Sequence, residues 1–309
     1  MADDLYPIID VAEYESAQHE ELGSREKFWI EGPGGELWLY KKPRPTNLSE
    51  IWSEKLATEI ANLIGVPCAE VQLAKIDGDL GTISKSFNPS GLQCFHGNEV
   101  LANVVSRYDI ARRFGQSDHN VKNIIKAISW SAENGLLDFE GTLSELALFA
   151  MLDGLIGNTD RHHENWMIIL NQNWQIRMVA GMSLFRVAPS YDHASSLGRE
   201  LNDDRRQRIL SENRMLNYIV GGRGKRGKGR VYADENRRVA FSPLRLAQLI
   251  GRWQPEIARP GLERLGNTPD AAFRNVISKI PPVLMSDTAK NFAYQFVITS
   301  KAELLRSVK

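Results

Sequence analysis

A polar segment, residues 157–165, lies between two strongly apolar parts of the sequence and constrains how the surrounding chain can fold. It reads Gly-Asn-Thr-Asp-Arg-His-His-Glu-Asn, and residues 143–156 before it are apolar at most positions. That apolar pattern predicts a helix buried on most of its circumference, with a capping-box start at Thr142 and a stop at Gly157. The polar segment is therefore expected to form a rigid loop, a frequent position for catalytic groups.

A hairpin is expected directly after this loop. Residues 166–170 are short and β-prone, a turn follows them, and a second strand is predicted from Trp174. The hairpin leads to a segment rich in serine and glycine, residues 188–198, in which Asp192 follows a strand-like stretch. Because a hairpin returns the chain to the edge where it began, it can bring Asp192 close to the polar loop.

Three oxygen-bearing side chains, Asp160, Asn165 and Asp192, thus stand on two loops joined by one hairpin. Oxygen ligands of this kind suit Mg²⁺, which binds one or two carboxylates together with phosphate oxygens. Phosphoryl transfer needs an aspartate to position the attacking hydroxyl, and an asparagine and a second aspartate to hold the metal. It also needs a strand lysine that contacts phosphates and a helix glutamate that orients this lysine.

The N-terminal part of the chain supplies candidates for the lysine and the glutamate. Residues 28–41 predict two strands around a glycine-rich turn and place Lys41 at a strand end, where it could equally be a solvated lysine. A helix is predicted at residues 47–64, and Glu54 and Glu59 lie at opposite edges of its apolar face. The helical periodicity does not choose between these glutamates.

The distribution of the predicted elements indicates an α+β protein of two lobes. Up to about residue 95 the patterns predict strands and one helix, whereas beyond it they predict mainly helices. We therefore expect a small β-rich N-lobe at residues 1–95, a larger, mainly helical C-lobe at residues 96–309, and a cleft between them. The helices expected in the C-lobe are residues 99–106, 121–132, 143–156, 244–253, 269–280 and 289–305.

Composition argues against several classes of function. The chain has 309 residues, 42% of them hydrophobic, and a net charge of +0, so charge gives no reason to expect a nucleic acid or a membrane surface as partner. Its two cysteines, Cys68 and Cys94, are too few for a disulfide framework or a zinc cluster. No apolar run is long enough to span a membrane, and the acidic N-terminus lacks a signal-like run, so a cytoplasmic location is expected.

The order of these motifs resembles the HipA-type kinases, which are serine/threonine kinases of bacterial toxin–antitoxin systems. The resemblance runs from about Gly23 to Gly198 and implies a bilobal, protein-kinase-like fold with ATP and Mg²⁺ as cofactors. It also implies a protein substrate, such as an aminoacyl-tRNA synthetase or another translation component, and an antitoxin as a possible partner. The residues that carry it are Leu-Ile-Gly-Asn-Thr-Asp at 155–160, Asn165, Tyr191-Asp192, and Gly-Ser-Arg-Glu-Lys at 23–27.

The same resemblance implies a role for each candidate residue. Asp160 would be the catalytic base, and Lys41 would contact the phosphates. Glu54, rather than Glu59, would be the helix glutamate. The implied metal ligands are Asn165 and Asp192, and the implied nucleotide contacts are Gly23 and Ser24 of a phosphate loop, Ser84, Lys85, Ser86 and Phe87 of an adenine-binding hinge, and His162.

Two features depart from the family pattern. Full-length members carry an additional N-terminal subdomain, which we expect this chain to lack, so it resembles the shorter members. The family often has a regulatory serine just before the glycine of the phosphate loop, whereas residues 19–22 here read His-Glu-Glu-Leu. The nearby substitutes for an autophosphorylation site are Ser16 and Ser24.

Two alternatives come from other classes of protein. His162, His163, Asp192 and His193 could form the metal cluster of a phosphohydrolase, although adjacent histidines diverge on most backbones. Residues 221–230 alternate glycine with lysine or arginine, which favours a flexible solvated loop over contact with an RNA-bound or otherwise acidic substrate. A nucleic-acid-binding module using this stretch is disfavoured, because the stretch has no aromatic residues for base stacking.

Overall fold

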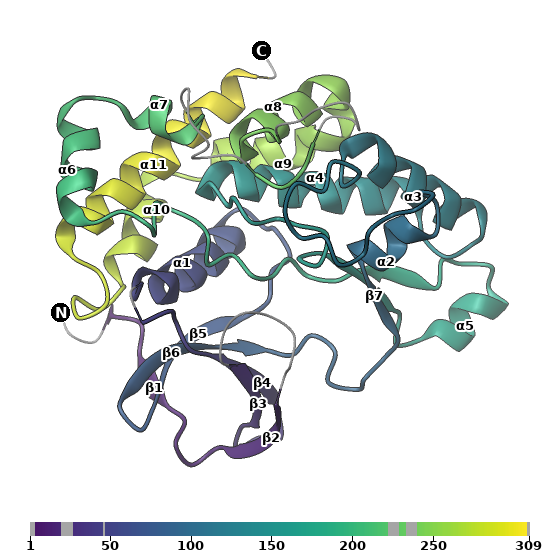
Figure 1. The fold of residues 1–309 in the computed structure, drawn as a ribbon, viewed down its shortest axis with the longest axis horizontal. Coiled ribbons are helices and arrows are strands. Elements are labelled where there is room, and N and C mark those ends of the chain that lie inside the picture. The colour runs from purple at the N-terminus through teal and green to yellow at the C-terminus, as the bar shows by residue number, and fades with distance from the viewer. Residues whose placement is uncertain (1–3, 20–26, 46, 222–228, 233–239, 308–309) are drawn as a thin grey trace.

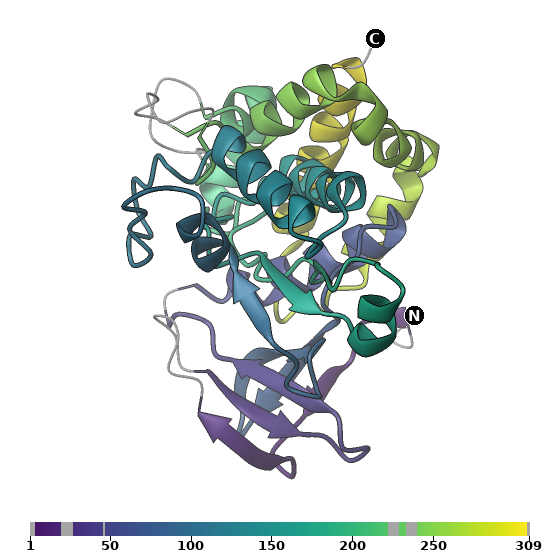
Figure 2. The same ribbon diagram turned by 90° about the vertical axis from the view of Figure 1, so that its right-hand side faces the viewer.

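The chain forms a small β-rich lobe and a larger helical lobe, which meet along one side (Figure 1, Figure 2). The computed structural model describes residues 4–19, 27–45, 47–221, 229–232 and 240–307. The α+β, two-lobed architecture expected from the sequence is confirmed. The lobe boundary expected at residue 95 stays a prediction.

The N-lobe contains a six-stranded sheet in the order β1-β5-β6-β4-β3-β2, antiparallel except between β1 and β5. Sequence patterns indicated β3 and β4 at residues 28–41, and the tight turn Asp77-Gly78 between β5 and β6 has positive φ at both residues. They did not indicate β1 and β2, which are short and lack an alternating apolar pattern. The strands are β1 (Ile8–Asp10), β2 (Glu15–His19), β3 (Lys27–Glu31), β4 (Leu37–Lys41), β5 (Val71–Ile76) and β6 (Asp79–Lys85).

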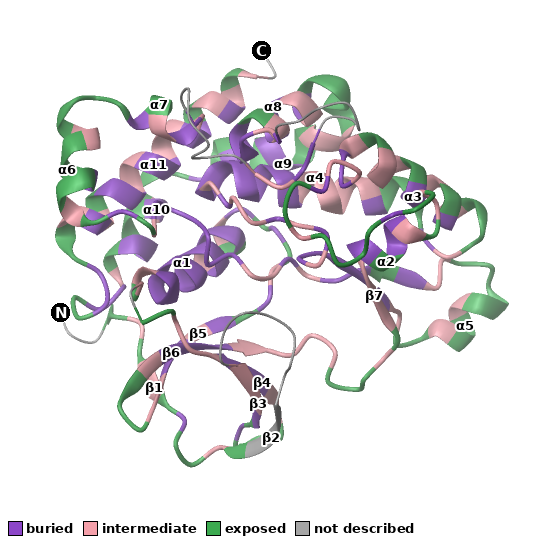
Figure 3. Cartoon of the chain, in the orientation of Figure 1, coloured by how far each residue is buried: buried purple, intermediate pink, exposed green. Residues whose placement is uncertain are grey.

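The helix of the N-lobe, α1 (Ser49–Leu63), is buried along most of its length (Figure 3). Trp52 and Leu56 on α1 belong to the same hydrophobic core as Phe273 and Phe292 of the C-terminal helices. Burial of such large side chains is the main favourable term in folding, at about 1.5–3 kcal/mol for each. This shared core therefore fixes α1 against the C-lobe.

Helices make up most of the C-lobe, and α4 lies at its centre, with α3, α8, α9 and α11 packed around it. The helix predicted before the polar loop is thus confirmed, and Gly157 ends it in the left-handed conformation. Its start was predicted wrongly, because Asp138 caps the helix by accepting from Gly141 N, and Thr142 lies inside it. The helices are α2 (Gly97–Ala102), α3 (Val121–Glu133), α4 (Phe139–Ile156), α5 (Trp174–Val179), α6 (Asp203–Ser211), α7 (Met215–Ile219), α8 (Pro243–Trp253), α9 (Pro255–Asn267), α10 (Asp270–Ser278) and α11 (Asp287–Arg306).

A second sheet of three antiparallel strands lies beside the polar loop, in the order β7 (Cys94–His96), β8 (Met167–Leu170) and β9 (Phe185–Val187). The strand predicted from Trp174 is wrong, because this segment forms α5 and buries none of its side chains. The two edges of β8 are already occupied by β7 and β9, so the α5 segment has no edge of β8 to pair with. The β8–β9 pair still returns the chain toward the polar loop.

Two glycines with similar backbone conformations test the packing at the end of α4. Gly157 has φ 67° and a Cβ there would collide with the Phe296 ring, whereas Gly181 has φ 64° and open space around it. We expect Gly181→Ala to lose about 1–2 kcal/mol of unfolding free energy, the cost of a left-handed L-residue. Gly157→Ala should lose a further ~1–3 kcal/mol through overpacking. Urea unfolding measures both losses, and equal values would contradict the close packing of Phe296.

Candidate functional site

A cleft of about 840 Å³ lies between the N-lobe sheet and the 157–165 loop. Every described residue that the sequence assigned to the site lines this cleft. These residues are Lys41, Glu54, Ser84, Lys85, Ser86, Phe87, Asp160, His162, Asn165 and Asp192. Gly23 and Ser24 lie outside the described residues. The fold thus brings the candidates together, while the chemical role of each stays a prediction.

Lys41 reaches the cleft from the end of β4, where it pairs with Thr82 of β6. Its Nζ lies 3.5 Å from Oδ1 of Asp192, and its side chain is 13% exposed. Successive side chains of a strand point to opposite faces. Lys42 accordingly forms a separate ion pair of 2.6 Å with Asp79, at 41% exposure. The strand register therefore directs Lys41, and not Lys42, into the cleft.

Glu54 is the glutamate of α1 that lies at the cleft. It is buried, and its Oε1 accepts a hydrogen bond of 3.0 Å from the backbone N–H of His193. Glu59 instead forms an ion pair of 2.5 Å with Lys55. Glu54 is thus tied to the loop that carries Asp192, and its expected orientation of Lys41 stays a prediction.

The expected hinge, residues 84–87, leaves β6 along the cleft. The backbone N–H of Ser86 donates to the carbonyl of Leu37 at 2.8 Å. Phe87 packs against Tyr191, with their ring centroids 5.7 Å apart. These contacts attach the hinge to the sheet on one side and to the C-lobe on the other.

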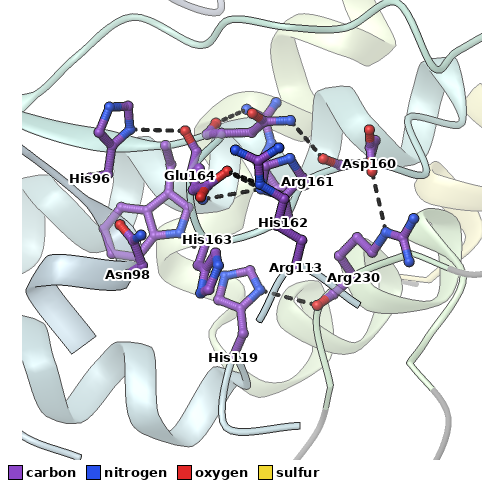
Figure 4. A network of polar contacts seen from close by, with 12 residues as sticks. His96, Asn98, Arg113, His119, Asp160, Arg161, His162, His163, Glu164 and Arg230 are labelled. Carbon is purple, nitrogen blue, oxygen red and sulfur yellow. Dashed lines mark hydrogen bonds and ion pairs between the residues drawn. The ribbon is translucent and has the colours of Figure 1, made fainter. Parts of the chain in front are cut away.

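Hydrogen bonds within the 157–165 loop hold Asp160 in place (Figure 4). The N–H of Asp160 donates to Oδ1 of Asn158 at 3.1 Å, and Nδ2 of Asn165 donates to the carbonyl of Asp160 at 2.8 Å. Nδ2 of Asn158 donates in turn to Oδ1 of Asp153 on α4 at 2.9 Å. Because the amide nitrogen of Asn165 serves the loop, its side-chain oxygen is the atom left for a ligand.

Arg161 is the central cation of this loop. Its Nε and Nη2 donate to the two carboxylate oxygens of Asp153, each at 2.8 Å. Nη1 donates to the carbonyl of Asn165 at 2.6 Å, and Nη2 donates to Oγ of Ser190 at 2.7 Å. Burial is the largest single influence and would lower the pKa of Arg161, but the charge of Asp153 and its hydrogen bonds, together with smaller contributions from Tyr191 and Cys68, raise this pKa overall, so the guanidinium stays charged.

Sequence reasoning missed the Arg161–Asp153 pair, although one signal for it existed. Asp153 is the only charged residue between positions 146 and 156, in a helix that is otherwise apolar. A charge in such a position requires a partner when the helix is buried. The identity of that partner depends on the path of the loop after Gly157, which no local pattern gives.

The same guanidinium holds the loop that carries Asp192. Nη2 of Arg161 lies 3.1 Å from Nε2 of His193. Burial, and then the charge of Arg161, lower the pKa of His193 well below its ordinary value, so the neutral ring accepts this hydrogen bond. Asp192 itself has φ 57° and lines the cleft beside Lys41. Asp160, Asn165 and Asp192 are thus mounted on one buried scaffold.

The histidines of the loop do not support the phosphohydrolase alternative. The rings of His162 and His163 lie at 80° to each other, and Nδ1 of His163 contacts the Tyr108 hydroxyl at 2.7 Å in the interior. Burial lowers the pKa of His163 to about 4. Within the described ranges, no group of three or more histidine, cysteine, aspartate or glutamate residues is arranged to hold a metal ion.

Arg230, the last residue of the alternating basic stretch, lies in the cleft. Its Nε donates to Oδ1 of Asp160 at 3.2 Å (Figure 4). Its guanidinium stacks over the ring of Phe114 at 4.3 Å. At this residue the solvated-loop interpretation is therefore wrong, while residues 222–228 lie outside the described part of the chain. No local pattern indicated this contact, because 70 positions separate Arg230 from Asp160.

The buried ion pair can be tested against an exposed one. Asp153→Asn keeps the shape of the side chain but leaves the charge of Arg161 uncompensated. We expect this variant to lose about 3–5 kcal/mol of unfolding free energy. The matched control is Glu256→Gln, which removes an exposed pair of 2.9 Å with Arg259 and should cost less than about 1 kcal/mol. Similar losses in urea for the two variants would show that the buried pair is not the stronger constraint.

Two solved structures resemble this fold closely enough to be informative. The proinflammatory kinase CtkA of Helicobacter pylori matches with a TM-score of 0.77 and 18% identity, over 98% of this chain and 97% of that chain. HipA of a Shewanella oneidensis MR-1 toxin–antitoxin system, solved with HipB and operator DNA, matches with a TM-score of 0.54 and 12% identity, over 98% of this chain and 67% of that chain. No curated protein matches the sequence significantly. At these identities the likeness shows the fold, which is kinase-like.

Membership of a family is shown by the sequence itself. The family model described as the HipA-like C-terminal domain matches residues 21–254, well beyond residue 198, where the motif resemblance ended. This match spans the whole cleft and most of the chain. The chain therefore belongs to the HipA-like C-terminal domain family.

Proposed function

We propose that this protein is an ATP- and Mg²⁺-dependent kinase that phosphorylates serine or threonine residues of a protein substrate. The observation that carries the proposal is the assembly of Asp160, Asn165, Asp192 and Lys41 in one cleft of a HipA-family chain. Catalysis of phosphoryl transfer rests on positioning and on electrostatic stabilisation, so a fixed set of such groups is what the reaction needs.

The oxygen atoms at the cleft fit a hard divalent cation. Asn165 directs its amide nitrogen into the loop and keeps its side-chain oxygen, and Asp192 offers a carboxylate. Mg²⁺ prefers such ligands and completes its shell with water and phosphate oxygens. Lys41, 3.5 Å from Asp192, would hold a phosphate close to that metal. When bound, Mg²⁺–ATP supplies the γ-phosphoryl group.

Asp160 would act on the acceptor hydroxyl. A protein hydroxyl is a weak nucleophile, and a carboxylate within hydrogen-bond reach can orient it and accept its proton as the bond to phosphorus forms. The backbone of Asp160 is fixed at both its N–H and its carbonyl, and its side chain is partly exposed in the cleft. The hinge at 84–87 and His162 would complete the nucleotide pocket.

The biological role is proposed from the family. We propose a toxin of a toxin–antitoxin system that acts in the cytoplasm on a translation component, such as an aminoacyl-tRNA synthetase, and binds an antitoxin protein. Support comes from the family match and from the HipA neighbour, which was solved with HipB. In the described parts of the chain, no helix has the length and apolar character to cross a membrane.

Asp160→Asn tests the proposed base. The variant keeps the shape of the side chain but loses its basicity, so we expect phosphoryl transfer to fall by about 10²–10⁴-fold. ATP affinity should stay nearly unchanged, because Asp160 is not expected to hold the nucleotide. Calorimetry with ATP and transfer of labelled phosphate to lysate proteins, on one preparation, measure the two quantities. Loss of ATP binding together with transfer would mean that Asp160 serves the metal or the fold instead.

Neighbouring lysines give a matched pair for the nucleotide site. Lys41→Ala should weaken productive ATP binding, because Lys41 lines the cleft. Lys42→Ala should have little effect, since Lys42 points away and pairs with Asp79. The Michaelis constant for ATP and the dissociation constant of an ATP analogue measure both variants. Equal effects, or a larger effect at Lys42, would remove Lys41 from the phosphate-binding role.

A further inference from the structure

Two arginines from outside the 157–165 loop each hold a carboxylate of that loop. Nε of Arg230 donates to Oδ1 of Asp160 at 3.2 Å, and Nε of Arg113 lies 2.7 Å from Oε2 of Glu164. Both arginines line the cleft, and Figure 4 shows them reaching the loop. Phosphoryl transfer needs no arginine on the catalytic base, so the Arg230 contact requires its own explanation.

The backbone of Arg230 is held firmly in place. Its carbonyl accepts a hydrogen bond of 3.0 Å from Nδ1 of His119, whose Nε2 accepts from Nε1 of Trp166 at 3.2 Å. Burial keeps the His119 ring neutral, and these two partners fix its hydrogen on Nδ1. The N–H of Tyr232 also donates to the carbonyl of His119 at 3.1 Å. These hydrogen bonds therefore fix the position of Arg230 at the cleft.

The side chain of Arg230 retains binding capacity. A guanidinium has five N–H donors, and the contact with Asp160 uses Nε. Among the residues that the structure describes, no hydrogen bond occupies its Nη1 or Nη2. The ring of Phe114 below it is 70% exposed, and Ile110 on the same segment is 46% exposed and also lines the cleft. Beside Asp160 the cleft thus presents the two terminal nitrogens of a guanidinium, next to the exposed apolar side chains of Phe114 and Ile110.

We propose that Arg230 selects acceptor segments that carry an acidic residue beside the serine or threonine, an inference that rests on the proposed kinase function. A planar guanidinium binds a carboxylate through two parallel hydrogen bonds, which are stronger than neutral ones. An acidic acceptor residue takes the Arg230 side chain away from Asp160 and leaves Oδ1 of Asp160 to the acceptor hydroxyl. A neutral or basic acceptor leaves Arg230 on Asp160.

Binding can be measured without phosphoryl transfer. The probes are three fluorescent peptides with a central alanine in place of the acceptor, identical except for flanking glutamates, glutamines or lysines. The wild type should bind the glutamate peptide at least about tenfold more tightly than the glutamine peptide. Arg230→Gln should reduce this ratio to about one, and Arg230→Lys should restore part of it, because it keeps the charge but loses the fork.

A distant arginine serves as the control for net charge. Arg259→Gln removes a half-exposed guanidinium on α9 and should leave the preference for the glutamate peptide as in the wild type. The inference is overturned if the wild type binds the three peptides equally, or if Arg230→Gln keeps the preference. Fluorescence anisotropy at fixed ionic strength measures all four proteins, and their melting temperatures confirm that they are folded.

The same peptides with a central serine separate this inference from the proposed function. For the wild type we expect kcat/KM to be at least about tenfold higher with the glutamate peptide than with the glutamine peptide. Arg230→Gln should abolish this preference. Transfer without acid preference overturns the inference and leaves the kinase proposal standing. Arg230-dependent acidic binding without transfer to any peptide or lysate protein contradicts the kinase proposal alone. If Arg230→Gln instead increased transfer equally to all three peptides, Arg230 would only inhibit Asp160, and its role in selecting acceptors would be overturned.

Discussion

The buried ion pair between Arg161 and Asp153 is the interaction on which the site depends. A guanidinium removed from water is tolerated only where a counter-charge and hydrogen bonds replace its hydration. Arg161 obtains these from the end of α4, from the carbonyl of Asn165 and from the Ser190–His193 segment. Satisfying one side chain therefore forces three segments into a single arrangement, which sets the positions of Asp160 and Asp192.

The two lobes contribute jointly to this arrangement. Glu54 on α1 accepts from the backbone of His193, and apolar side chains of α1 are buried in a core shared with the C-terminal helices. The N-lobe side of the cleft is thus fixed to the C-lobe by burial of apolar surface and by a hydrogen bond to the Asp192 loop. A change in the position of α1 would have to disrupt both interactions.

Six charged residues at the cleft form three ion pairs: Lys41 with Asp192, Arg230 with Asp160, and Arg113 with Glu164. All six residues line the cleft, so a metal ion, a phosphate or an acidic residue that binds there would compete for one member of a pair. The balanced net charge of the whole chain conceals this local arrangement. The net charge of a chain informs about its solubility and about binding to partners of opposite charge, but not about ion pairs within a cleft.

Local sequence patterns determined a substantial part of this protein. Helical periodicity and Gly157 predicted the buried helix before the polar loop, the apolar run at residues 37–40 placed Lys41 at a strand end, and the motif order led to Asp160, Asn165 and Asp192. These features depend on neighbours within a few positions, which is the range over which periodicity and capping act. Tertiary structure alone decided that residues 174–179 form a helix, because β9 already occupies the edge of β8 that they would have joined. It also decided the partners of Arg161 and Arg230, since a buried or cleft-lining charge binds whichever opposite charge the packed chain brings near, across as many as 70 positions.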